Sequence, residues 1–388
     1  MRRVYLDNNA TTPVLPAVLD AMRPFFEEHF GNASSIHHHG QETRAAVERS
    51  RESVASLLNC RASEVVFTSG GTEADNLAIF GLVRAGAHVI TSTIEHHAVL
   101  NSCKHLQESG CEVTFVPVDG RGLVDADDIR RALRPNTKLI TVMMANNETG
   151  VLQPVEEIGK MASEADVYFH TDGVQAAGKV PLDVKQIGCD LLSISGHKMH
   201  AQQGIGALYV RKGTILQPML YGGSHERSRR AGTENVPAIV GLGKAAELAH
   251  QAIQHGDMAK IATLRDRLQS GILGAVEATG VNGEGAPRVP NTTNIYFDYI
   301  EGEALVIALD LKGLAISTGA ACSSGAIEPS HVLTAMGMSP QRARASIRFS
   351  LGKQNTSEDI DFALELIPAT VARLRELSPI YNKAVVSH

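Results

Sequence analysis

Apolar residues follow two alternating patterns between about residue 40 and residue 210. Short apolar runs typical of strands alternate with longer segments in which apolar positions recur every three or four residues, as in helices. We expect strands at 64–69, 88–92, 112–118, 138–146, 167–172, 190–195 and 206–211. We expect helices at 44–59, 72–85, 98–110 and 154–165. This alternation predicts a mostly parallel sheet covered by helices on both faces.

Downstream of this region the pattern changes. Residues 236–278 are helical in character, and we interpret them as a connector into a second unit. There we expect strands at 291–297 and 346–352 and helices at 301–313 and 357–377. The prediction is therefore an α/β protein with a large domain over residues 16–255. Residues 1–15 and 256–388 would form a smaller α+β domain.

Composition narrows the function classes. A net charge of −6 over 388 residues gives no basic footprint for nucleic acid or for an anionic membrane. The first residues are too poor in apolar side chains for a signal peptide, so we expect a cytoplasmic protein. The five cysteines include no C-x-x-C pair, which indicates neither a disulfide framework nor a zinc site. A small-molecule substrate or a protein partner is favoured.

Residues that can hold a phosphate follow the first expected strand. Gly70 and Gly71 allow a tight turn, and Thr72 stands where a helix begins. The free N–H groups of a helix N-terminus bind anions. By itself this arrangement is also typical of an ordinary turn between a strand and a helix.

Two other strand ends carry complementary chemistry. Asp172 ends the strand 167–172, and Lys198 follows the strand 190–195. In open α/β sheets, ligands bind at the carboxyl ends of strands. A lysine that forms a Schiff base and a carboxylate that keeps a pyridine nitrogen protonated are what a pyridoxal phosphate enzyme needs. Ser195 and His197 would share the phosphate with the glycine turn.

The segment 316–331 follows neither pattern. It is rich in Gly, Ala and Ser, and it contains Cys322. Small residues bury little surface and lose much conformational entropy when they are fixed, so we expect a loop that moves.

Several segments, in order, resemble the successive motifs of the cysteine desulfurases of the class-V aminotransferase family. These segments are 5–13, 30–40, 70–79, 95–100, 145–150, 170–179, 195–198, 229–236, 317–333 and 346–352. The similarity extends from residue 4 to about residue 360. It implies a dimeric pyridoxal phosphate enzyme of fold type I. Residues 300–309 and 371–381 are most similar to the nitrogen-fixation branch, NifS.

The resemblance also implies roles for residues of the motifs. Lys198 would be the Schiff-base lysine, and Asp172 would pair with the pyridine nitrogen. His96 would stack on one face of the ring and transfer protons. The further cofactor contacts would be Val174 on the other face, Asn147 and Gln175 at the ring oxygen, and Gly71, Thr72, Ser195 and His197 at the phosphate, with Thr233 reaching the phosphate of the neighbouring subunit. Arg348 would bind the substrate carboxylate, with Asn147 beside it.

The implied reaction converts L-cysteine to L-alanine. Cys322 would take the sulfur as a persulfide and deliver it to an acceptor for iron–sulfur cluster assembly. The thiol must first reach the cofactor to take the sulfur and then move outward to reach the acceptor, so it needs a loop that moves. Neither a resident metal nor a membrane or nucleic-acid partner is predicted, and contact of Cys322 with a transient iron–sulfur cluster stays open.

One departure from the family motifs keeps two alternatives open. Gln202 and Gln203 stand where the family usually has Pro-Lys, and the lost proline should loosen the following turn. The first alternative is another lyase of the same fold, such as a selenocysteine lyase. The second is a cofactor-binding protein with impaired catalysis.

Overall fold

The computed structural model describes residues 2–318, 329–378 and 381. Its main feature is a seven-stranded sheet in the order β2-β8-β7-β6-β5-β3-β4. In that order the strands are Val65–Thr68, Gly206–Val210, Leu191–Ser195, Tyr168–Asp172, Thr137–Thr141, His88–Ser92 and Glu112–Val116. Only β8 runs antiparallel to its two neighbours in this sheet. The predicted mostly parallel sheet is confirmed.

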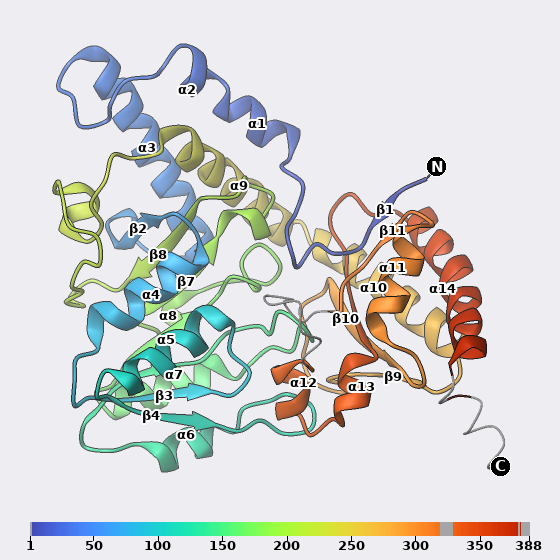
Figure 1. Ribbon diagram of the computed structural model, residues 1–388. Helices are drawn as coiled ribbons and strands as arrows, with labels where there is room; N and C mark the ends of the chain where they lie inside the picture. The colour runs from blue at the N-terminus through green and yellow to red at the C-terminus, as the bar shows by residue number, and fades with distance from the viewer. Residues whose placement is uncertain (1, 319–328, 379–380, 382–388) are drawn as a thin grey trace.

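Helices cover both faces of this sheet (Figure 1). On one face pack α3 (His38–Leu58), α6 (Ala126–Ala132), α7 (Val155–Glu164) and α9 (Val236–Gln254). On the other face pack α4 (Gly71–Leu82) and α5 (His97–Glu108). In β2, Val65 and Phe67 belong to the first core and Val66 to the second. Because side chains alternate across a strand, a run that is apolar throughout is buried on both faces.

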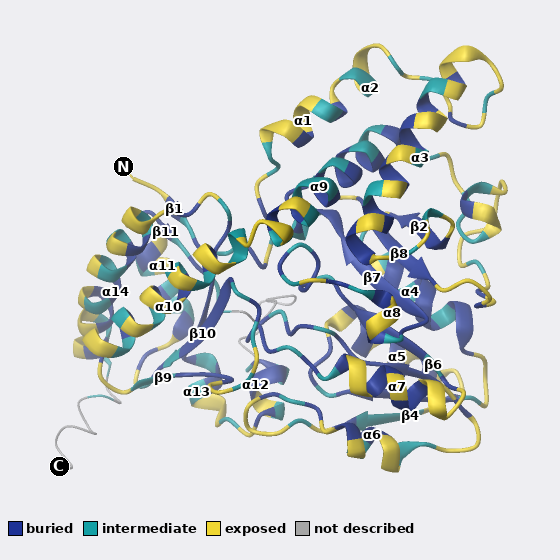
Figure 2. Ribbon diagram, turned by 180° about the vertical axis from the view of Figure 1, so that it is seen from behind, coloured by how far each residue is buried: buried dark blue, intermediate teal, exposed yellow. Residues whose placement is uncertain are grey.

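A smaller unit lies beside the large sheet (Figure 1). Its sheet has the order β12-β10-β9, with strands Ser346–Ser350, Thr292–Phe297 and Thr279–Val281, all antiparallel. The helices α10 (Asp257–Ala275), α11 (Gly302–Asp310) and α14 (Ser357–Leu377) pack around it. The first strand, β1 (Val4–Tyr5), pairs with β11 (Leu314–Ala315) and joins the same core. Figure 2 shows buried strands inside and exposed outer helix faces in both units.

The structure contains short elements that the apolar pattern did not predict. These are the helices α1 (Pro16–Met22), α2 (Pro24–Glu27), α6, α8 (Val184–Ile187), α12 (His331–Ala335) and α13 (Pro340–Arg344), the 3₁₀ turns η1 (Ala62–Glu64), η2 (Gly196–Lys198) and η3 (His225–Ser228), and the strands β1, β9 and β11. One or two turns are too few to establish a helical period. The predicted connector is two helices, because Gly256 adopts φ +73° between α9 and α10. No helix in the described part of the chain combines the length and the apolar character that a membrane crossing needs.

Candidate active site

A cavity of about 390 Å³ opens at the carboxyl edge of the large sheet. Its volume lies in the range of small-molecule sites. It is lined by residues that follow β2, β3, β5, β6 and β7, the strands whose carboxyl ends share this edge. The predicted site residues that line it are Gly71, Thr72, His96, Asn147, Asp172, Val174, Gln175, Ser195, His197, Lys198 and Arg348.

One end of the cavity is suited to an anion. The helix α4 begins at Gly71 without a side-chain cap, so its first N–H groups are free to bind. A Cβ on residue 71 would lie 2.8 Å from Cγ2 of Val174, so the close approach here requires glycine. Ser195 and His197 lie in the same cavity. Burial and the nearby Lys198 lower the pKa of His197 to about 4, so its ring is a neutral donor at neutral pH.

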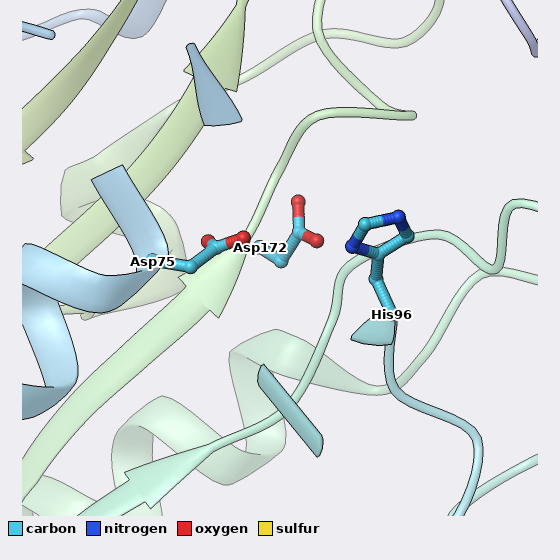
Figure 3. A group of neighbouring side chains, drawn as sticks. All are labelled: Asp75, His96 and Asp172. Atoms are coloured by element: carbon cyan, nitrogen blue, oxygen red, sulfur yellow. The ribbon is translucent and has the colours of Figure 1, made fainter. Parts of the chain in front are cut away.

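Two carboxyl groups and a histidine lie together near the middle of the cavity (Figure 3). Ligand atoms of Asp75, Asp172 and His96 lie within 4.8 Å of one another. Burial raises the pKa of both aspartates, and each backbone or side-chain donor that reaches them opposes this rise. Oδ1 of Asp75 is buried without a hydrogen-bond partner. A positively charged N–H group, such as a protonated pyridine nitrogen, would relieve this concentration of acid groups.

His96 is held in one tautomer. Its Nδ1 accepts a hydrogen bond of 3.1 Å from the backbone N–H of Ala98, at the N-cap of α5. Burial and the positive charge of Lys198 lower the pKa of His96 to about 4. At neutral pH the ring is therefore uncharged and carries its proton on Nε2.

Lys198 lies in η2, directly after β7. Its Nζ donates to the backbone carbonyls of Asn9 and Ala10, both at 2.6 Å. Burial, together with the positive charge of Arg348, lowers the pKa of Lys198 to about 8, while Asp7 and Asp172 oppose this shift. A substantial fraction of the amine is therefore neutral, and so nucleophilic, near neutral pH.

This pKa predicts how the cofactor-free protein takes up pyridoxal phosphate. Only the neutral amine attacks an aldehyde, so the rate constant should rise about tenfold per pH unit below pH 8 and level off above it. A lysine with the ordinary pKa of 10.5 would give a rate that still rises at pH 9. Stopped-flow absorption of the loading protein between pH 6 and about pH 10 would distinguish the two. A rate that continues to rise through pH 9 would contradict the lowered pKa.

Arg348 enters the cavity from β12 of the smaller sheet. It is 5% exposed, and its Nη2 lies 2.7 Å from Oδ1 of Asp7. Its Nη1 donates to the carbonyl of Asn147, while Nε is buried without a partner. A guanidinium held on two sides, with an N–H remaining on each Nη, is suited to binding a small carboxylate.

The set of donors fits pyridoxal phosphate. An uncapped helix N-terminus with a serine and a neutral histidine can hold the phosphate, and the acid group at Asp172 can face the pyridine nitrogen. Lys198 supplies the amine between them.

Comparison with known proteins agrees with this geometry. The family model described as aminotransferase class-V matches residues 4–362. The chain belongs to the aminotransferase class-V family. A cysteine desulfurase IscS of Methanosarcina thermophila is 50% identical over 386 residues, which cover 98% of this chain and 95% of the relative.

Solved structures of the class-V family give the same result. One described as a NifS-like protein has a TM-score of 0.89 and 36% identity, and the match covers 96% of this chain and all of the other. SspA in complex with cysteine has a TM-score of 0.80 and 37% identity, and the match covers 91% and 99% of the two chains. The predicted membership of the class-V cysteine desulfurases, the fold type and the dependence on pyridoxal phosphate are confirmed.

The described structure does not test two of the predicted site residues of this class-V chain. Thr233 is exposed and lies in the segment between η3 and α9. Cys322 lies outside the described residues, and so does most of its predicted loop. The prediction for each stays a prediction.

Sequence reasoning assigned no role to several residues of the class-V site. Asn9 and Ala10 hold the Lys198 amine, Asp7 pairs with Arg348, and Asp75 lies beside Asp172. The first three lie in a recognised motif of the N-terminal segment, which shows no local sign of approaching the sheet. The position of Asp75 could have been predicted from the sequence. Thr72 begins the helix that follows the first expected strand, and Asp75 lies about one helical turn later, on the same side of that helix.

The departure from the class-V pattern at residues 202 and 203 leaves the site residues in place. Gln203 is exposed, and Gly204 completes the turn at φ +81°. The amide of Gln202, in contrast, is buried against α9, and neither its oxygen nor its nitrogen has a hydrogen-bond partner in the described part of the chain. Lys198 keeps both of its carbonyl partners. The departure therefore costs stability without displacing the lysine.

Gln202→Pro is expected to raise the free energy of unfolding by about 1 kcal/mol. The change removes an unsatisfied buried amide and restricts the unfolded chain. Urea unfolding of the cofactor-free protein would measure the effect. The exposed Gln203→Ala is the control, with an expected change within about 0.5 kcal/mol. A less stable Gln202→Pro variant would contradict the prediction.

Proposed function

We propose that this cavity converts L-cysteine to L-alanine and passes the sulfur to Cys322, which becomes a persulfide. The thiol of Cys322 gains one sulfur atom and the substrate loses it, so no external oxidant is needed. The observation that supports this reaction best is the convergence of Lys198, Asp172 and Arg348 on one cavity at the sheet edge. The relatives described as cysteine desulfurases support the same reaction.

The cofactor would be held by residues at both ends of the cavity. The N-terminus of α4, with Ser195 and His197, would bind the phosphate, and Asp172 would face the pyridine nitrogen. His96 and Val174 would lie against the two faces of the ring, and Asn147 and Gln175 would reach its oxygen. Pyridoxal phosphate supplies an electron sink that stabilises negative charge on the substrate carbons.

The substrate would be oriented by Arg348. The N–H groups of its guanidinium fork that remain beyond the contacts with Asn147 and Asp7 would bind the carboxylate of cysteine. Lys198, with a pKa of about 8, can both take and return a proton near neutral pH. His96, which is uncharged near neutral pH, would donate a hydrogen bond from Nε2 to the reacting groups.

We further propose a homodimer in which each phosphate site is completed by the neighbouring chain. In one chain Thr233 is exposed and does not line the cavity. The nearby segment exposes Ile215, Leu220 and Tyr221, which a second copy would cover. A monomeric mass in solution for the active holoenzyme would contradict this arrangement.

The sulfur acceptor is a second protein. We favour an iron–sulfur scaffold as acceptor in the cytoplasm. The resemblance of residues 300–309 and 371–381 to the NifS branch suggests a scaffold for nitrogenase maturation, and a housekeeping scaffold or a thiolation pathway is the alternative. The large domain would span residues 16–255, and the separate core of the smaller unit supports grouping residues 1–15 with 256–388.

The proposed reaction is tested by product stoichiometry. The holoenzyme with L-cysteine and a reducing thiol should release alanine and sulfide in equal amounts. A lyase that eliminates sulfide would yield pyruvate and ammonia in place of alanine. A strong preference for selenocysteine would favour the selenocysteine lyase alternative, and a coloured protein without turnover would favour the impaired one.

A further inference from the structure

Lys179 is a buried lysine that the proposed mechanism does not use. It is 8% exposed and follows β6, one helical turn beyond Gln175. Its Nζ donates to Oε1 of Gln175 at 2.6 Å and to Oδ1 of Asn9 at 3.0 Å. No ion pair recorded among the described residues includes Lys179. Burial lowers the pKa of Lys179 well below its ordinary value, and the positive charges of Lys198 and Arg348 lower it further. A cation buried without an anion is costly.

The contact with Lys179 fixes the orientation of the Gln175 amide. The other end of that amide lies 3.1 Å from the backbone carbonyl of Asn9. A carbonyl oxygen only accepts, so the atom that faces it must be the amide nitrogen. The amide oxygen then faces Lys179, which donates to it. The two hydrogen-bond partners alone therefore fix the orientation of the amide.

The cavity therefore meets an N–H group of Gln175 and not its carbonyl. One N–H of Nε2 points to Asn9, and the second remains for a ligand in the cavity that Gln175 lines. If the amide turned over, it would present its oxygen and repel an anionic group.

The same side chain also supports the reacting lysine indirectly. Lys179 holds the side chain of Asn9, whose backbone carbonyl accepts from Nζ of Lys198 at 2.6 Å. The backbone N–H of Asn9 donates to Oγ of Ser350, two residues along β12 from Arg348. Lys179 therefore lies at the centre of contacts that reach both the ring oxygen site and the Schiff-base lysine.

We propose that Lys179 is a positioning residue that fixes Gln175 as a hydrogen-bond donor to the ring oxygen of pyridoxal phosphate. This inference rests on the proposed function of the cavity. A donor at that oxygen, held in place by the hydrogen bond from Lys179, stabilises negative charge there. The nitrogen that joins Lys198 to the cofactor then holds its own proton less tightly, because the neighbouring oxygen carries less free charge. Lys179 thereby sets the pH at which the bound cofactor changes colour.

The test is a pH titration of the visible absorption of the holoenzyme. Lys179→Met keeps the apolar stem and removes the donor and the charge. We expect its colour transition to move to higher pH by about one unit, a tenfold gain in proton affinity. Lys160→Met is the matched control, because Lys160 is exposed on α7 away from the cavity, and its titration should equal that of the wild type.

A double-variant cycle separates positioning from charge alone. In a Gln175→Ala background, Lys179→Met should add little further shift, since the residue through which it acts is absent. Lys179→Gln keeps a donor without the charge, so we expect a smaller upward shift, and it provides the measurement if the methionine variant does not fold.

Two results would overturn the inference. One is an unchanged transition in both Lys179 variants. The other is a shift from Lys179→Met that is as large without Gln175 as with it. Failure of the wild type to bind the cofactor or to produce alanine would instead refute the proposed function, so the two failures are distinguishable.

Discussion

Lys198→Ala is expected to lower kcat for alanine release from L-cysteine by at least about 10³-fold, within the range that a positioned proton-transfer group contributes. The variant loses both the amine that joins the cofactor and the group that returns protons near neutral pH. Arg348 and Asp172 remain in the cavity, so substrate and cofactor binding should persist in weaker form.

The measurement is alanine formed per enzyme under saturating pyridoxal phosphate. Lys160→Ala is the control, because it removes an exposed lysine outside the cavity and should turn over like the wild type. The absorption of the variant should be that of free cofactor, since no lysine amine is linked to it. Retention of more than about a tenth of wild-type turnover would remove Lys198 from the proposed role.

Cys322→Ala is expected to reduce sulfide release by at least about 10²-fold while the protein keeps its bound cofactor. The other described thiols are poor replacements for Cys322. Burial raises the pKa of Cys60 and Cys103 to about 12, and it raises the pKa of Cys111 and Cys189 as well. The thiolate is the nucleophile, so none of the described cysteines can replace Cys322 near neutral pH.

The comparison uses sulfide and alanine measured together, with Cys60→Ala as the matched control. Cys60 is partly exposed and outside the cavity, so its variant should release both products at the wild-type rate. Mass spectrometry after a single turnover should show one added sulfur on Cys322 in the wild type. Equal sulfide release from Cys322→Ala would make the thiol a bystander and favour a different lyase reaction.

Local patterns were sufficient to predict the large sheet and most of its helices. Fully apolar runs such as residues 65–67 can only be buried on both faces, so they predict a sheet between helix layers. Asp172 and Lys198 could be predicted because Asp172 ends one strand and Lys198 lies three residues beyond the end of the next. The reversed direction of β8 was not predictable, because the apolar pattern of a strand is the same in both directions.

By itself, then, the sequence determined which residues end the strands and so which side chains line the sheet edge. Only the tertiary structure decided which distant segments complete the site. Asn9 meets Lys198, Gln175 and Lys179, and Asp7 meets Arg348 on a strand of the smaller sheet. These partners are 166 to 341 residues apart in the chain. The physical reason is that periodicity records only whether a side chain is buried, whereas the choice of a buried polar partner depends on how separately folded layers pack.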